Sequence, residues 1–245
     1  MKLHQQLIVI FFGPPGAGKG TQAEYLVDRF GFLHLETSKV IQEQLASHND
    51  NEVIMIDGLG YPFYEERRKF FAGELNTTEV VVFWMVEAIK NLISQGKNIV
   101  LSGSPRTVFE AEKIFKAPFD LPMRGASLMF YLDIPLDVSL VRNGQRLLCT
   151  ICRLPHRGDI VSNELNSRNT QAPSLCRRCG GELRRRESLD DSEIIRVRWR
   201  EYEKRTLPVL DIAHSYGIPV QRIDATLGEE EIHTLVYNHL FVREH

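Results

Sequence analysis

The chain lacks several features that would place it in other classes of protein. No run of apolar residues approaches the roughly 20 that a membrane-spanning helix needs. An excess of charge of either sign is also missing, because 30 basic and 32 acidic residues leave a net charge of only −2. This near balance argues against a general nucleic-acid binder. The apolar stretch at 7–12 is short and runs into a glycine-rich loop without a cleavage site, so it predicts a buried strand and no signal peptide. We therefore expect a cytoplasmic protein that contacts neither membrane nor nucleic acid.

Cysteine is scarce, and its placement is informative. The four cysteines form two Cys-x-x-Cys pairs, Cys149 with Cys152 and Cys176 with Cys179, separated by 23 residues. In a reducing compartment such pairs predict a metal site in preference to disulfides. Four thiolates suit a tetrahedral structural Zn²⁺ that holds a small subdomain, although four unrelated thiols are the alternative. His156 is a possible substitute ligand, but we expect it to be a surface histidine.

Strand and helix patterns alternate along the 245 residues. This order predicts an α/β fold, a parallel sheet with helices on both faces, and ligands at the carboxyl ends of the strands. The motif "GPPGAGKGT" at 13–21 makes this a sheet of the P-loop NTPase type. Segments 36–76 and 147–185 do not fit the alternation, so we expect them to be insertions that reach over those ends. The expected strands are 7–12, 32–36, 98–103, 126–134 and 219–224, and the clearest helices are 18–31 and 79–95.

A phosphate-binding loop is the most specific motif. "GPPGAGKGT", residues 13–21, fits G-x-x-x-x-G-K between an expected strand and an expected helix. Its glycines let the backbone N–H groups turn toward phosphate oxygens at a helix N-terminus, and Lys19 can reach the outer phosphates. Gly20 follows the lysine, so no hydroxyl stands directly after it to reach Mg²⁺, and Thr21 comes one place later. A chance glycine-rich turn is the weaker interpretation.

With Pro15 and Gln22 added, this loop resembles that of the adenylate kinases and related nucleoside monophosphate kinases, and the resemblance extends over nearly the whole chain. It implies phosphoryl transfer from ATP·Mg to a nucleoside monophosphate, with AMP as the default, in a monomer. It also implies a core at 1–35, 77–146 and 186–245, a monophosphate-binding arm at 36–76 and a zinc-binding lid at 147–185.

The resemblance further assigns residues to roles. Arg142 and Arg146, four apart, are expected on one helix face beside the ATP base and phosphates, and a further lid arginine is one of Arg184, Arg185 and Arg186. The catalytic candidates are Lys19, Arg106, Arg146 and Arg198. The ATP-binding candidates are Gly13, Gly16, Ala17, Gly18, Lys19, Gly20, Thr21, Arg142 and Arg146. The monophosphate-binding candidates are Thr37, Gln42, Glu74, Leu75, Asn76, Gly103, Arg106, Glu110 and Arg198.

Four positions depart from the family pattern. Ser102 and Lys39 stand where the family has aspartates on the magnesium side, Gln42 replaces a phosphate-binding arginine, and Glu110 replaces the glutamine that reads adenine. A carboxylate at 110 suits guanine better than adenine, so base selection is expected to be relaxed or shifted, unless Glu110 is a solvated helix residue.

Two interpretations follow from these departures. We favour a divergent kinase, because Arg106 and the lid arginines are kept together and the loss of one charged contact lowers the rate without abolishing it. The second is an ATP-binding protein without transferase activity. A P-loop kinase for another small acceptor is a further alternative, which keeps the phosphate loop and the arginines. A zinc-ribbon nucleic-acid binder would leave the phosphate loop unexplained.

Overall fold

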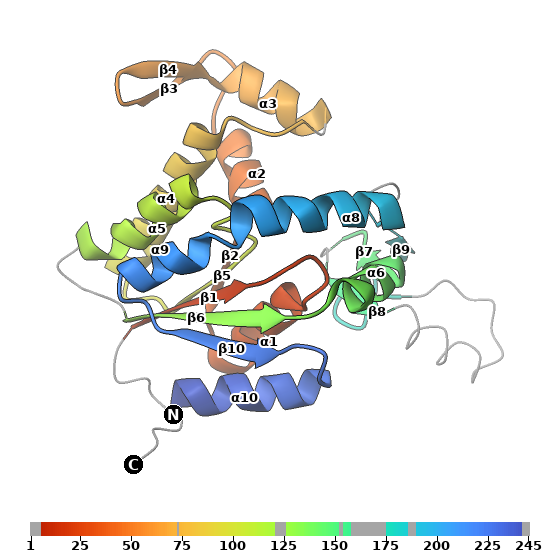
Figure 1. The fold of residues 1–245 in the computed structure, drawn as a ribbon. Helices are drawn as coiled ribbons and strands as arrows, with labels where there is room; N and C mark the ends of the chain where they lie inside the picture. The colour runs from red at the N-terminus through yellow and green to blue at the C-terminus, as the bar shows by residue number, and fades with distance from the viewer. Residues whose placement is uncertain are drawn as a thin grey trace.

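The computed structural model describes residues 6–72, 74–120, 126–151, 154–157, 175–185 and 190–241. A five-stranded parallel sheet lies at its centre, in the order β10-β6-β1-β5-β2 (Figure 1). The α/β class predicted from the sequence is confirmed, and each expected strand is present within about two residues of its expected ends. The strands are β1 (Leu7–Phe12), β2 (Leu33–Glu36), β5 (Ile99–Ser102), β6 (Ala126–Asp133) and β10 (Val220–Asp224).

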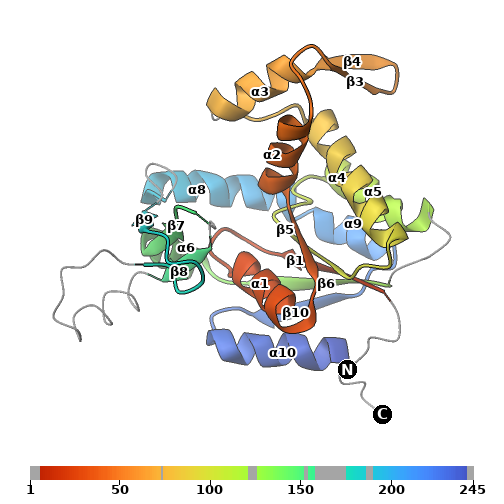
Figure 2. The ribbon, with the colours of Figure 1, turned by 180° about the vertical axis from the view of Figure 1, so that it is seen from behind.

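Helices cover both faces of this sheet (Figure 2). The side chains of β1 explain why its sequence is continuously apolar: Ile10 belongs to a core with Trp84, whereas Phe11 belongs to a second core with Leu26. One face carries α1 (Lys19–Phe30) and α10 (Glu229–Phe241), and the other carries α4 (Thr78–Ser94), α5 (Val108–Lys116), the short 3-10 helix η1 (Ala117–Asp120) and α9 (Val209–Ser215).

The first irregular segment, between β2 and α4, projects away from the sheet (Figure 1). It contains α2 (Thr37–Ser47), the antiparallel hairpin of β3 (Val53–Ile56) and β4 (Leu59–Pro62), and α3 (Phe63–Ala72). Asp57 and Gly58 make the hairpin turn with φ angles of 50° and 83°, as Asp-Gly turns do. Glu36, the first residue of the segment expected as an insertion, belongs to β2 and hence to the central sheet.

The second irregular segment lies beyond the carboxyl end of β6 (Figure 1). Helix α6 (Leu136–Gly144) leads into a small antiparallel sheet, ordered β8-β7-β9, of β7 (Arg146–Cys149), β8 (Pro155–Arg157) and β9 (Leu183–Arg185). The chain returns through α8 (Ser192–Glu201) and the π-helical turn η2 (Tyr202–Thr206). The expectation that Arg142 and Arg146 share a helix face is wrong, because α6 ends at Gly144 and Arg146 begins strand β7. Among the described residues no helix is long and apolar enough to span a membrane.

Candidate active site

The loop after β1 has a backbone that only glycine permits at two positions. Gly13 has a φ of 140°, and a Cβ atom there would lie 2.2 Å from the carbonyl oxygen of Leu132. Gly16 has a φ of 81°, and a Cβ there would lie 2.6 Å from the side-chain nitrogen of Asn143. The close approach of these glycines to β6 and α6 fixes the curl of the loop at the start of α1.

Helix α6 braces this loop through two buried polar side chains. Ser139 donates a hydrogen bond to the carbonyl of Pro15 at 2.7 Å, and Asn143 donates to the carbonyl of Ser139 at 2.8 Å. Neither residue was predicted from the sequence. Their signal was present, because two polar residues four apart lie on the face of α6 that packs inward.

Lys19 lies among the other three catalytic candidates. Its ammonium group donates to the carbonyls of Gly13 and Pro14, both at 2.8 Å. Burial, followed by repulsion from Arg106, Arg198 and Arg146, lowers the pKa of Lys19 to about 7. The structure therefore brings together four cations drawn from α1, the loop after β5, β7 and α8, and such a convergence of positive charge fits a polyphosphate anion.

Asp190 holds two of these arginines and was not singled out in the sequence. Its buried carboxylate accepts from Nε of Arg146 at 3.2 Å and from a terminal nitrogen of the same guanidinium, and it lies 4.0 Å from Arg198. Because Asp190 lies just before α8, its carboxylate can orient both Arg146, at the start of the second irregular segment, and Arg198, in the helix that follows it.

The three candidates for a further lid arginine lie in or just after β9. Arg184 pairs with Glu182 at 2.8 Å, and Arg185 donates to the carbonyl of Gly144. Arg186 lies outside the described residues.

The loop after β5 carries Arg106 and is held by Glu110. The Glu110 carboxylate accepts from the backbone N–H of Arg106 at 2.8 Å and from the Ser104 hydroxyl at 3.2 Å, while Thr107 caps α5 by accepting from the Glu110 N–H. Arg106 itself donates through Nε to the carbonyl of Gly103 at 2.5 Å. Glu110 is therefore more than a solvated helix residue, because it orients the loop that presents Arg106.

The candidates on α2 differ from one another in their surroundings. The hydroxyl of Thr37 is buried and has no hydrogen-bond partner among the described residues. Gln42 is exposed and, together with Arg67, lines a cavity of about 530 Å³ between α2 and α3. The ammonium nitrogen of Lys39 lies 3.6 Å from a carboxylate oxygen of Glu36, so the two side chains form an ion pair.

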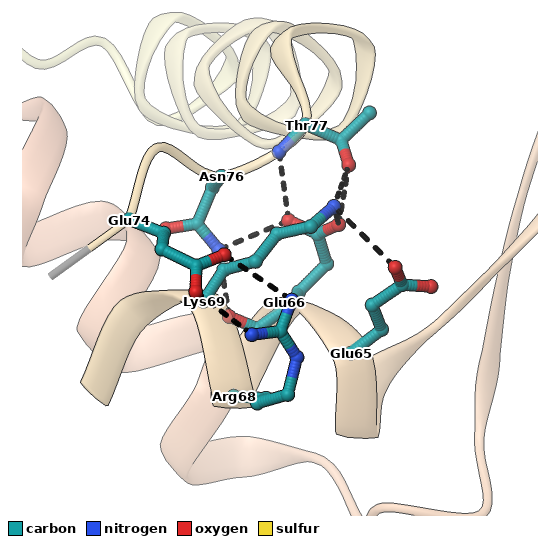
Figure 3. Close-up of polar contacts among 7 residues, drawn as sticks. All are labelled: Glu65, Glu66, Arg68, Lys69, Glu74, Asn76 and Thr77. Carbon is teal, nitrogen blue, oxygen red and sulfur yellow. Dashed lines mark hydrogen bonds and ion pairs between the residues drawn. The ribbon is translucent and has the colours of Figure 1, made fainter. Parts of the chain in front are cut away.

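The remaining arm candidates lie where the chain passes from α3 into α4 (Figure 3). Glu66, buried on α3, accepts from the side-chain amide of Asn76 at 2.9 Å, and from the backbone N–H and hydroxyl of Thr77 at 2.9 Å and 2.5 Å. Glu74 pairs with Arg68 at 2.9 Å, and the side chain of Leu75 is exposed. One buried carboxylate thus fastens this connection to α3.

Three of the four cysteines converge at the small sheet. The sulfur atoms of Cys149, Cys176 and Cys179 lie within 4.8 Å of one another, and those of Cys149 and Cys179 are 3.4 Å apart. Backbone N–H groups point at the sulfurs of Cys149 and Cys176, as they do around metal-bound thiolates. This donor set fits a thiophilic metal ion.

The other two metal candidates differ in what the structure says of them. Cys152 lies outside the described residues. His156 was expected at the surface, but it is half-buried and its ring nitrogen lies 3.3 Å from the sulfur of Cys176.

A second cavity, of about 520 Å³, lies at the carboxyl ends of β6 and β10. Asp133, Asp224 and Thr226 are among the residues that line it. Hydrogen bonds from Thr226, followed by the charge of Arg142, lower the pKa of the Asp224 carboxyl, so Arg142 lies near this cavity.

Comparisons with known proteins agree with this geometry. The family model for adenylate kinase matches residues 11–218. An adenylate kinase of Caldicellulosiruptor saccharolyticus is 31% identical over 227 residues, which is 91% of this chain and 93% of the relative. One from Methanosarcina acetivorans is 31% identical over 215 residues, which is 86% of this chain and 88% of the relative. One from Carboxydothermus hydrogenoformans is 30% identical over 234 residues, which is 95% of this chain and 98% of the relative. The chain belongs to the adenylate kinase family, and it is accordingly a phosphotransferase that acts as a nucleoside monophosphate kinase.

Proposed function

We propose that this enzyme transfers the terminal phosphoryl group of ATP·Mg reversibly to AMP, so that ATP and AMP give two ADP. The observation that carries the proposal is the convergence of Lys19, Arg106, Arg146 and Arg198: the pKa of Lys19 is lowered first by burial and then by the charges of the three arginines. Phosphoryl transfer needs positioned positive charge more than covalent chemistry, and four cations supply it.

On the ATP side, backbone N–H groups bind the inner phosphates: those of Gly13, Gly16, Ala17 and Gly18 come from the curled loop, and those of Gly20 and Thr21 from the first turn of α1. Lys19 and Arg146 neutralise the outer phosphates. Arg142 lies beside the cavity that includes Asp224 and Thr226, which we assign to the base of ATP. Asp190 acts as a positioning residue, because it orients Arg146 and Arg198.

On the acceptor side, Arg106 and Arg198 bind the monophosphate, beside Gly103 and the buried hydroxyl of Thr37. Gln42 is exposed on α2 and contributes no charge. The connection of Glu74, Leu75 and Asn76 offers backbone groups to the base, since the side chains of Glu74 and Asn76 are bonded to α3. We keep Glu110 as a candidate base contact, with the loop-holding role described above as its alternative.

A structural Zn²⁺ belongs to this proposal. Cys149, Cys176 and Cys179, with Cys152 as the fourth ligand, would hold it, and the ion would cross-link a lid at 147–185 whose small sheet has little apolar core of its own. The core at 1–35, 77–146 and 186–245 and the arm at 36–76 complete the division. We further propose a monomer that works in the cytoplasm, where reduced thiolates remain available to zinc.

A nucleotide panel tests the proposed function. ADP formation from ATP·Mg is measured with AMP, GMP, CMP and UMP in turn, with Lys19→Ala as the control. Turnover with AMP that depends on Lys19 supports the proposal, and a preference for GMP assigns Glu110 to base selection. Tight ATP binding without turnover on any monophosphate would favour the ATP-binding protein or another acceptor.

The zinc is tested separately by metal analysis of the purified protein. One Zn²⁺ per chain is expected, and Cys149→Ser should release it and lower the melting temperature. Cys149 is the suitable site because it is fully buried within the cysteine cluster. Full retention of zinc in this variant would overturn the ligand set.

A further inference from the structure

A chain of three hydrogen-bonded side chains lies beside the phosphate loop and has no role in the function proposed so far. The hydroxyl of Ser102 lies 2.6 Å from Nε2 of His34, and Nδ1 of His34 lies 2.9 Å from a carboxylate oxygen of Glu24. The three residues come from the end of β5, from β2 and from α1. Ser102 is buried, and the side chains of His34 and Glu24 are 8% and 14% exposed, so the chain is largely shielded from water.

The order of these groups is that of a nucleophile, a base and an orienting acid. The hydrogen bonds from His34, and after them those from Arg178, outweigh the effect of burial and lower the pKa of the Glu24 carboxyl to about 2, so Glu24 is ionised at neutral pH. An ionised carboxylate only accepts hydrogen bonds, so Nδ1 of His34 carries the proton. Nε2 is then free to accept the proton of the Ser102 hydroxyl.

The strand pairing of Ser102 places this residue beside the start of the phosphate loop. Ser102 pairs with Phe11 of β1, two residues before Gly13, and is followed by Gly103. A Cβ atom on Gly103 would lie 3.3 Å from a guanidinium nitrogen of Arg106, and the charge of Arg106 acts on Lys19. Ser102 therefore shares the strand ends with the cations that would hold the terminal phosphate of ATP.

We propose that Ser102 is a phosphorylation site of this enzyme, and that the ATP bound at its own phosphate loop is the donor. The Ser102 oxygen attacks the γ-phosphorus and a new P–O bond forms, while the bond from that phosphorus to the bridging oxygen breaks and ADP leaves with the electron pair. The hydroxyl proton passes to Nε2 of His34, and Glu24 stabilises the imidazolium. The inference rests on the proposed ATP site, but it does not require a nucleoside monophosphate.

The lid is connected to the same chain of side chains. Arg178, between Cys176 and Cys179, bonds to the second carboxylate oxygen of Glu24 and to Asp28 at 3.0 Å. Because this arginine fixes the Glu24 carboxylate from the opposite side, it is a positioning residue for His34. The phosphoserine product carries a charge of about −1.5 to −2, which the neighbouring cations stabilise.

The experiment uses the full chain incubated with ATP·Mg and no acceptor, followed by phosphopeptide mapping. Phosphate on Ser102 is expected, at a rate that does not change when the protein is diluted. His34→Asn should lower this rate by roughly 10² to 10⁴-fold, and Lys19→Ala should abolish the modification. Ser127→Ala is the control, because Ser127 lies in β6 of the same sheet but pairs with Ile8 near the start of β1, away from the phosphate loop, and the change should leave phosphorylation of Ser102 intact.

Each outcome decides the inference. An unmodified Ser102, phosphate on another residue in its place, or an unchanged rate in a folded His34→Asn variant overturns it. ADP formation from ATP and AMP, measured on the same preparation, judges the proposed function separately: an enzyme that makes ADP while Ser102 stays unmodified keeps the function and loses the inference. Phosphorylated Ser102 without turnover of AMP would support the inference and count against the proposed function.

Discussion

The triphosphate side and the monophosphate side of this enzyme share one sheet edge, but their charges are arranged differently. On the proposed triphosphate side the phosphate loop matches its family, α6 braces it from behind, and the buried Asp190 orients Arg146. On the proposed monophosphate side the exposed Gln42 stands where the family has an arginine, and the positive charge comes from Arg198 and from Arg106, whose loop Glu110 holds. The proposed acceptor site therefore has one arginine fewer than the family pattern, whereas the phosphate loop keeps its pattern.

Removing the central cation should break the triphosphate side most severely. Lys19→Met is expected to lower kcat/KM for ATP by roughly 10³-fold or more, because a charge that stabilises the transferring phosphoryl group is lost. Thermal melts of the ligand-free protein should show no loss of stability, since the half-buried Lys19 is repelled by three arginines. A variant with near-normal turnover would contradict the central place given to this residue.

Asp190 should matter less than the cations that it holds. Asp190→Asn removes the charged partner of Arg146, and we expect kcat/KM to fall by roughly ten- to a hundredfold. Asp191→Asn is the matched control, because Asp191 is the next residue and is exposed. Equal losses in both variants would show that the effect is not the orientation of the arginines.

The monophosphate side can be improved as well as broken. Gln42→Arg should lower KM for AMP by about tenfold, because a charged contact to phosphate at this exposed position should be worth about 1.5 kcal/mol. Gln44→Arg, two residues further along α2, adds the same charge away from that position and should leave KM unchanged. Steady-state kinetics at constant ionic strength distinguish the two, and an equal gain in both would mean a general effect of charge.

The connection of the arm to α4 should be sensitive to acid. Burial raises the pKa of the Glu66 carboxyl, but hydrogen bonds from Thr77, Asn76 and Lys69 together outweigh it and leave the pKa below its ordinary value. The stability from Glu66 is therefore present above the ordinary pKa of a glutamate and is lost as pH falls through the lower folded pKa. Glu66→Gln should cost about 1–3 kcal/mol at neutral pH, a difference that shrinks in acid.

Glu65→Gln is the control for this prediction, because Glu65 lies 3.9 Å from Lys69 and is about half exposed. Its effect should stay within about 0.5 kcal/mol in denaturant titrations. If Glu66→Gln matched it, the buried carboxylate would have no special part in fastening the connection.

The smallest expected effect is proton uptake when ATP binds. The pKa of Lys19 is lowered to about 7 in the ligand-free protein, mainly by burial, and bound phosphates should raise it again. Above pH 7, ATP binding should therefore be accompanied by the uptake of about one proton. In the ligand-free protein, stability should rise with pH between the folded pKa of Lys19 and the ordinary lysine pKa, because only the unfolded state holds this proton there. Calorimetry in two buffers of different ionisation enthalpy measures the uptake, which Lys19→Met should remove.

The sequence by itself determined the parallel sheet, the phosphate loop and the grouping of three cysteines. The apolar runs of the strands and the spacing of glycine and lysine in the phosphate loop are local features of the sequence. Continuously apolar strands predict a parallel sheet that helices cover on both faces, as the two cores confirm. The expectation of a shared helix face for Arg142 and Arg146 failed, because spacing alone does not reveal that α6 stops at Gly144.

Only the tertiary structure decided which distant side chains meet. Asp190 lies 44 residues from Arg146, and Ser102 lies 68 residues from His34, so no local pattern joins either pair. The same holds for Glu66, whose carboxylate reaches past the end of α3 to Thr77. Buried polar groups must find partners, and which partners they find depends on the packing of whole elements, which the residue types along the chain do not encode locally.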